Sequence, residues 1–129
     1  MISKAQKNQL FYLVLTMLWG YFIFYLSSIP DLSSGLGTVY DLVLRKLAHI
    51  FVYAVLTYFV SNSLGYNKRA PLLFVIVAVM AYAITDEIHQ AGIGGRLGSH
   101  KDIIIDSFGV FIGMLCYKYK FKRKTKNPS

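Results

Sequence analysis

Four long apolar stretches dominate this sequence and constrain its fold more than any other feature. They cover residues 10–29, 47–64, 71–88 and 103–119. Each is close to the ~20 residues that a helix needs to cross the hydrocarbon core of a bilayer. Helices are expected because backbone polar groups inside a membrane must be satisfied within the segment itself. The sequence therefore predicts an all-α polytopic membrane protein, built as a bundle of four transmembrane helices in a lipid bilayer.

The composition agrees with this prediction. Of the 129 residues, 55% are hydrophobic and only 16% are charged, with a mean hydropathy of +0.47. A soluble domain carries about 25% charge. We divide the chain into a short N-terminus (1–9), a helical membrane domain (10–119) and a basic tail (120–129). The net charge of +8 comes mostly from short runs beside apolar segments, and no nucleic-acid motif is present, so a nucleic-acid partner is not expected.

The basic residues also predict an orientation. If the N-terminus is cytoplasmic, ten of the 14 Lys and Arg residues fall on the inner side and four on the outer side. The outer four are Arg45, Lys46, Arg96 and Lys101. Cytoplasmic segments of membrane proteins carry the excess of Lys and Arg. Both termini are therefore predicted to be cytoplasmic (N-in, C-in).

The acidic residues and histidines gather at the opposite end. All six acids and all three histidines fall on the predicted outer side or at outer helix ends: Asp31, Asp41, Asp86, Glu87, Asp102, Asp106, His49, His89 and His100. Ionisable residues at membrane depth are costly, so they usually face the bundle interior and pair with one another. Any chemistry or recognition by this chain is therefore expected at the outer leaflet.

Helical spacing places these polar residues on shared faces, since residues three or four apart are neighbours on a helix. The sets are Arg45, His49 and Tyr53 on the helix predicted around the second stretch, Asp86, Glu87 and Gln90 on the third helix, and Asp102 and Asp106 on the fourth. Short connections make neighbouring helices antiparallel, which brings these positions to one level. Gly109 and Gly113 continue the Asp106 stripe and would allow another helix to approach closely.

These residues form three ordered motifs. They are Arg45-Lys46-x-x-His49-x-x-x-Tyr53, then Asp86-Glu87-x-x-Gln90, then Arg96-x-x-x-x-x-Asp102-x-x-x-Asp106-x-x-Gly109-x-x-x-Gly113, preceded by Phe24-Tyr25-Leu26-Ser27-Ser28-x-Pro30. The ordered set resembles the VanZ-like family over nearly the whole chain except the basic tail. Many relatives have Asp-Lys where this chain has Arg45-Lys46, and Asn where it has Asp106. The resemblance implies a multi-pass protein of the bacterial cytoplasmic membrane with an envelope role, and the family's namesake is associated with resistance to the glycopeptide teicoplanin.

Three interpretations of the polar cluster remain open. In a recognition role, Arg45, Lys46 and Arg96 hold the phosphate or carboxylate of an outer-leaflet lipid-linked precursor, peptide or glycopeptide. The other ligand-binding candidates are Tyr53, Asp86, Gln90, Asp102 and Asp106.

In a catalytic role, His49 or Glu87 is the general base for hydrolysis or transfer on a lipid-linked envelope precursor. In a structural role, the charged groups pair and fix the helices, or the glycine stripe binds a partner helix. No metal motif and no cofactor are predicted, and the sequence does not indicate an oligomeric state. The single cysteine, Cys116, is expected to be a small core or lipid-facing residue.

Overall fold

The computed structural model describes residues 1–30, 37–65, 70–93 and 100–126. Its elements are four α-helices: α1 (Lys4–Ser27), α2 (Thr38–Leu64), α3 (Ala70–Ala91) and α4 (His100–Lys126). The all-α prediction is thereby confirmed. The predicted loops fall partly outside the described residues, as does Arg96.

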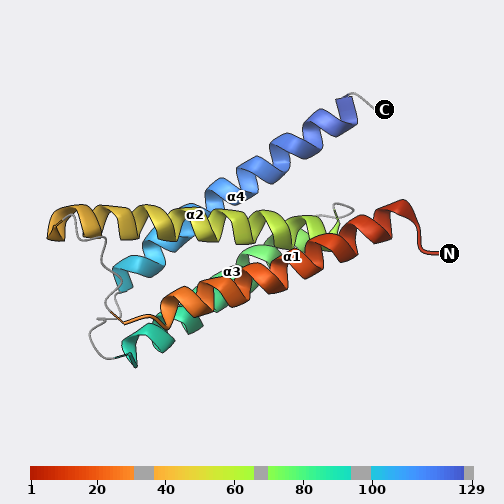
Figure 1. Ribbon diagram of the computed structural model, residues 1–129. Helices are drawn as coiled ribbons and strands as arrows, with labels where there is room; N and C mark the ends of the chain where they lie inside the picture. Colours follow the sequence, from red (N-terminus) through yellow and green to blue (C-terminus); the bar gives the residue numbers. More distant parts are fainter. Residues whose placement is uncertain (31–36, 66–69, 94–99, 127–129) are drawn as a thin grey trace.

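The helices alternate in direction along the chain. In Figure 1, α1 and α3 run one way and α2 and α4 run the other, so both chain ends lie at the same end of the bundle. The α2 helix contacts all three other helices, and its most extensive contact is with α4. This up-and-down arrangement is the one that short connections favour. The ends of α1 and α3 and the start of α4 therefore lie toward one end of the bundle.

Three of the helices are long and apolar enough to cross a membrane. They are α1 (Lys4–Ser27), α2 (Thr38–Leu64) and the Leu72–Ala91 part of α3. Within the described residues, α4 does not meet the same criterion. Its apolar middle is bracketed by Asp102 and Asp106 on one side and by basic residues from Lys118 onward on the other. The length and apolarity of three helices thus support a bilayer environment.

The helices extend beyond the apolar stretches from which they were predicted. The largest difference is in α2, which begins at Thr38 rather than near residue 47, so Arg45 and Lys46 lie inside a helix. Gly37, with φ 107°, stands just before the first residue of α2. At the start of α1, Ser3 and Gln6 form a capping box that satisfies two free backbone N–H groups. A capping box at α1 and a glycine before α2, rather than hydropathy, mark where these helices begin.

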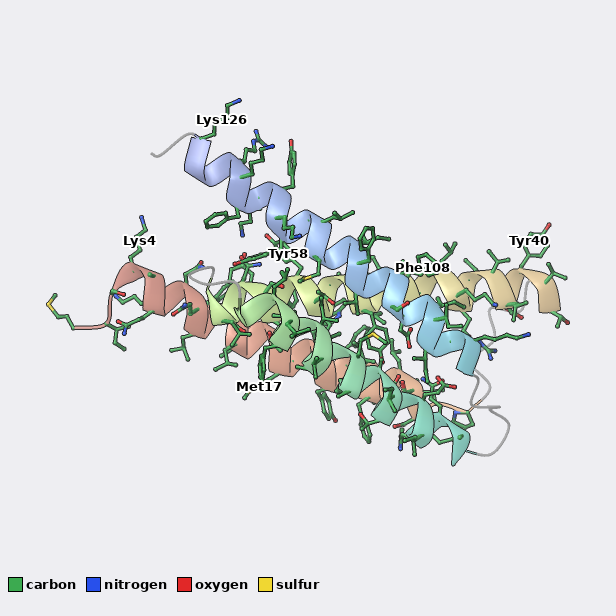
Figure 2. All side chains as sticks on the ribbon, turned by 180° about the vertical axis from the view of Figure 1, so that it is seen from behind. Lys4, Met17, Tyr40, Tyr58, Phe108 and Lys126 are labelled. Atoms are coloured by element: carbon green, nitrogen blue, oxygen red, sulfur yellow. The ribbon has the colours of Figure 1, made fainter. Side chains whose placement is uncertain are left out.

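The outside of the bundle is apolar. Side chains such as Met17 on α1 and Phe108 on α4 point away from the other helices (Figure 2) and are largely exposed. Leu10, Phe51, Phe74 and Phe111 are likewise exposed. Exposed apolar surface on every helix would be a liability in water, but it is what a bilayer requires.

The closest contact in the core is between the backbones of α2 and α4. A Cβ added at Gly109 would lie 2.5 Å from the carbonyl oxygen of Ile50 and 3.0 Å from Tyr53 Cβ. A Cβ at Gly113 would collide with the Ala54 carbonyl oxygen. The glycine stripe therefore packs within the chain, as small residues do where membrane helices meet.

Hydrogen bonds from aromatic side chains also tie the helices together. Trp19 Nε1 donates to the Val52 carbonyl oxygen over 2.9 Å, which joins α1 to α2. Tyr82 Oη donates to the Gly20 carbonyl oxygen over 2.6 Å, which joins α3 to α1. Tyrosine and tryptophan suit such sites because they combine a large apolar body with one polar atom.

A lysine clamp joins α1, α2 and α4 toward the end that holds the termini. Lys120 Nζ lies 2.9 Å from Tyr12 Oη and 3.3 Å from Asn62 Oδ1. It also lies 5.0 Å from the centre of the Tyr12 ring and 5.1 Å from that of Tyr58. The ammonium thus combines hydrogen bonds with cation–π contacts, and it anchors the basic end of α4 to the bundle.

Candidate functional site

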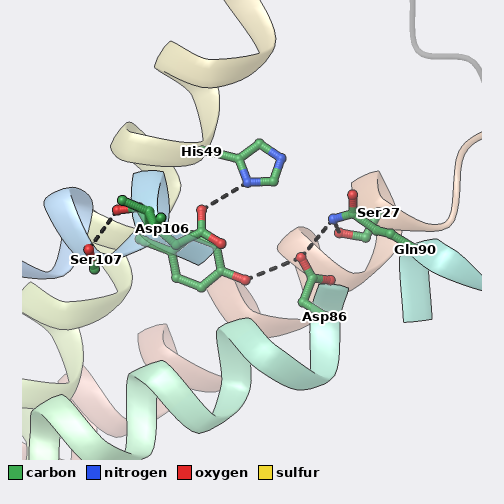
Figure 3. Close-up of polar contacts among 8 residues, drawn as sticks. Ser27, His49, Asp86, Gln90, Asp106 and Ser107 are labelled. Atoms are coloured by element: carbon green, nitrogen blue, oxygen red, sulfur yellow. Dashed lines mark hydrogen bonds and ion pairs between the residues drawn. The ribbon is translucent and has the colours of Figure 1, made fainter. Parts of the chain in front are cut away.

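A buried histidine–carboxylate pair joins α2 to α4. His49 Nδ1 and Asp106 Oδ1 are 2.9 Å apart (Figure 3), and their side chains are 14% and 1% exposed. An ionised carboxylate only accepts hydrogen bonds, so we assign the hydrogen to His49 Nδ1. This bond orients the imidazole and leaves Nε2 as the nitrogen that can exchange a proton with a ligand.

A second set of hydrogen bonds joins α1, α2 and α3 through Asp86. Tyr53 Oη donates to Asp86 Oδ2 over 3.2 Å, and Gln90 Nε2 donates to the same oxygen over 2.9 Å. Gln90 Nε2 also donates to Ser27 Oγ over 3.1 Å (Figure 3). All four side chains are buried. A continuous chain of polar groups therefore crosses three helices inside an apolar bundle.

The second carboxylate oxygen of Asp86, Oδ1, differs from Oδ2 in its hydrogen bonding. Asp86 is 5% exposed, and its Oδ1 atom is buried with no hydrogen-bond partner among the residues that the structure describes. Within the described part of the chain, Tyr53 and Gln90 are its hydrogen-bond donors, and both are neutral and bind Oδ2. A buried polar atom without a partner costs about 1–3 kcal/mol, more if charged. Such an atom marks a place where a further donor would be favourable.

Two serines at the end of α1, which were not predicted as site residues, extend the cluster. Ser27 accepts from Gln90, as described above, and Ser28 Oγ lies 3.0 Å from His89 Nε2. Ser28 Oγ also donates to the Phe24 carbonyl oxygen, so His89 is the donor to Ser28. The His89 ring stacks on Phe24 with centroids 4.5 Å apart. The available signal was the Ser27-Ser28 pair within the motif that ends the first apolar stretch.

Along α2, burial increases from the helix start toward the cluster. Arg45 is exposed, Lys46 is half-buried, His49 is 14% exposed and Tyr53 is fully buried. Arg45, His49 and Tyr53 are four positions apart and Lys46 stands three before His49, so all four lie toward one face of the helix. The cations therefore stand at the rim, while the histidine and tyrosine lie inside.

The remaining predicted residues are placed as follows. Glu87 is buried on α3, next to Asp86 in sequence, and Asp102 is half-buried in the first turn of α4. An acid in the first turn of a helix is favoured by the helix dipole. Arg96 lies outside the described residues, so its predicted place beside the acids is not tested.

The cluster is better suited to hydrogen bonding and proton exchange than to holding a metal ion. Among the described residues, no group of three or more His, Cys, Asp or Glu side chains could hold a metal. The cluster offers one oriented imidazole, one carboxylate oxygen with capacity to accept, and neutral hydroxyl and amide donors. These groups can bind a polar head and transfer a proton to or from it.

Comparison with known proteins supports the family resemblance. The family model described as VanZ/LLP1 matches residues 9–122, which is most of the chain and includes every residue of the cluster. Searches among curated proteins and among solved structures found no match. Because the match covers most of the chain, including the greater part of each helix and the cluster that joins them, the chain belongs to the VanZ-like family.

Proposed function

We propose that this VanZ-like protein recognises an anionic lipid-linked or cell-wall compound at the outer leaflet of a bacterial cytoplasmic membrane. The observation that carries the proposal is the buried network formed by Ser27, Tyr53, Asp86 and Gln90, next to the His49–Asp106 pair. Ionisable groups inside a membrane bundle are expensive, and they mark functional sites by default.

The orientation follows from the charges. With an even number of alternating helices, both termini share one side of the membrane, and the basic residues favour the cytoplasmic side. We propose that α4 is the fourth span, because Ile104, Phe108, Phe111 and Leu115 are exposed along it. The polar cluster then lies toward the outer leaflet.

The rim of the cluster supports an anionic ligand. Arg45 and Lys46 stand on the same helix as His49, one turn nearer its start, and at least part of each side chain is accessible. An exposed guanidinium can bind a phosphate or carboxylate through two parallel hydrogen bonds, and the neighbouring ammonium adds charge. The anionic part of a ligand would thus contact the rim, while its remaining polar groups reach the buried network.

The test is lipidomics on the protein purified in native membrane patches. We expect a co-purifying lipid or lipid-linked compound that is depleted when Arg45→Gln and Lys46→Gln are combined. The matched control combines Lys4→Gln and Lys7→Gln, which removes the same charge from the exposed start of α1. The control should retain the compound. Identical lipid profiles for all three proteins would rule out recognition by the rim cations.

The family context adds a phenotype to the proposal. The VanZ-like family takes its name from a protein associated with teicoplanin resistance, so we propose that this chain changes the response of its host to such glycopeptides. A bacterial host expressing the wild-type chain should tolerate more teicoplanin than the same host with the Arg45→Gln, Lys46→Gln variant at equal protein level. Equal teicoplanin tolerance of the two hosts would show that the rim cations of this chain do not contribute to glycopeptide resistance.

A second candidate function is favoured by the His49–Asp106 geometry. A carboxylate that holds Nδ1 and leaves Nε2 available is the arrangement by which a histidine acts as general acid or base. The reaction would be hydrolysis or transfer on a lipid-linked envelope precursor, with Glu87 as the other candidate base. His49→Gln should then abolish turnover of the co-purified compound while its binding persists. Full turnover by that variant would leave recognition as the function.

A further inference from the structure

The two carboxylates of the cluster differ in their partners. Asp106 is paired with His49, which can carry a positive charge. Asp86 has no cationic nitrogen within ion-pair distance among the described residues, and its two hydrogen-bond donors are the neutral Tyr53 and Gln90 side chains. A buried carboxylate without a compensating charge is unfavourable in a low-dielectric interior. Asp86 is therefore prepared to receive a positive charge.

The surroundings of Asp86 suit an ammonium group better than a metal ion. A hard metal ion needs about six oxygen ligands, and within the described ranges Asp86 offers one carboxylate oxygen without a hydrogen-bond partner. An ammonium needs only a few acceptors and is also attracted to aromatic faces. Tyr53 bonds Asp86 directly, and Tyr82 lies one turn along α3 on the same face, with the two tyrosine rings 6.4 Å apart.

The side chain of Gln90 lies between Asp86 and the C-terminal end of α3. It stands one turn nearer the end of α3, on the same face, and its amide already donates to Asp86 Oδ2. An amine that approaches from this end would displace the uncharged Gln90 amide, which is held by one hydrogen bond to the Asp86 carboxylate and one to the Ser27 hydroxyl. Asp86 itself lies five residues before the last residue of α3, which is about 7.5 Å along the helix axis at a rise of 1.5 Å per residue.

We propose that Asp86 binds a protonated primary amine of the ligand, with Oδ1 accepting one of its N–H groups. The inference rests on the proposed function, in which the anionic part of the same ligand contacts Arg45 and Lys46. It adds that the ligand is zwitterionic, with its cationic group placed deeper in the bundle than its anionic group. The amine can belong to a lipid head group or to a small soluble molecule.

The experiment compares head groups on the wild-type protein in nanodiscs of phosphatidylglycerol. Phosphatidylethanolamine, phosphatidylcholine or free ethanolamine is titrated in, and binding is followed by native mass spectrometry and thermal unfolding. Phosphatidylcholine keeps the phosphate and the positive charge but has no N–H. We expect phosphatidylethanolamine to bind about tenfold more tightly than phosphatidylcholine, a difference worth about 1.4 kcal/mol. Protection by free ethanolamine alone would assign the amine to a soluble ligand.

Variants identify Asp86 as the receptor. Asp86→Asn keeps the shape and removes the charge, so the preference for the primary amine should disappear. Gln90→Ala removes a competing donor, so the preference should be retained or increased. A merely structural role for both residues predicts equal loss in the two variants. If Asp86→Asn does not fold, the wild-type comparison and Gln90→Ala still decide the matter.

Three results would overturn the proposal. They are equal binding of the ethanolamine and choline lipids, an unchanged amine preference in Asp86→Asn, and Asp86-dependent stabilisation by sodium chloride without any amine. The proposed function fails separately, because it requires a compound that depends on Arg45 and Lys46 whether or not that compound carries an amine.

Discussion

Asp106, buried in α4, accepts a hydrogen bond from His49 on α2 over 2.9 Å, so each residue satisfies the other inside the bundle. Removing one partner of a buried ion pair costs about 3 kcal/mol or more. Asp106→Leu should therefore strongly lower the free energy of unfolding in mixed micelles. Asp106→Asn keeps an acceptor for Nδ1 and should cost less than half as much. Equal losses for the two variants would mean that shape, not the hydrogen bond, matters there.

The contact between α2 and α4 depends on two glycines. Gly109→Ala and Gly113→Ala each place a methyl group against backbone atoms of α2, which cannot move aside cheaply. Each should lower the free energy of unfolding by roughly 1–3 kcal/mol.

Gly20→Ala is the matched control for these variants. Among the described residues, a Cβ at Gly20 would meet only Tyr82 Oη, at 4.0 Å. Alanine is favoured over glycine within a helix by roughly 0.5–1 kcal/mol, so this control should be neutral or stabilising. Tolerance of alanine at both Gly109 and Gly113 would contradict the packing of α4 against α2.

The hydroxyl of Tyr53 is expected to stabilise the fold through its hydrogen bond to Asp86. Tyr53→Phe removes the hydrogen bond to Asp86 and leaves the carboxylate with Gln90 as its donor among the described residues. A hydrogen bond to a charged group contributes about 1.5–3 kcal/mol. Chemical denaturation should show a loss of that size, whereas Tyr21→Phe, at an exposed position, should show none.

The lysine clamp predicts a difference between two neighbouring lysines of α4. Lys120→Met removes the hydrogen bonds to Tyr12 and Asn62 and the contacts with two aromatic rings. We expect a loss of about 1 kcal/mol and a broader distance distribution between spin labels on α1 and the end of α4. Lys118→Met, at an exposed position, should leave the distribution unchanged. An unchanged distribution in both variants would show that Lys120 does not anchor α4.

Membrane orientation can be tested with single cysteines in a Cys116→Ser background. Ser3→Cys and Lys126→Cys, near the two chain ends, should resist a membrane-impermeant maleimide in intact cells. Val39→Cys, at the start of α2, should react, because we propose that this end faces outward. All three positions are exposed on the surface of the bundle. The opposite labelling pattern would invert the proposed orientation and place the polar cluster at the inner leaflet.

Hydropathy predicted the existence of the helices but not their ends. The apolar stretch of α2 begins near residue 47, yet the helix starts at Thr38. Polar residues such as Asp41, Arg45 and Lys46 can belong either to a helix or to a loop, so hydropathy does not place the start of α2. The local signal for that start is Gly37. An apolar run indicates which part of a helix can contact lipid. The helix itself extends further, and α2 ends only at Gly37 and Gly65, where the backbone has positive φ.

Helical spacing predicted which polar residues share a face, but not which helices pair. The four-residue spacing of Asp86 and Gln90 predicted a pair that the structure confirms. His49 pairs with Asp106, and Tyr53 pairs with Asp86, because of how closely the helices approach and where they cross. Those quantities arise from contacts between residues distant in sequence. The part played by Ser27 was missed for the same reason, because its partner lies on another helix.

The glycine contacts have a consequence for the spacing of residues in α4. Asp106 and Gly109 stand three positions apart, and both must face α2, one to bind His49 and the other to allow the backbones to touch. Deleting a single residue between them would rotate Asp106 by about 100° around α4 relative to that contact. The apolar character of α4 would be kept, but the imidazole would lose its acceptor. This short segment should therefore tolerate changes of side chain far better than changes of length.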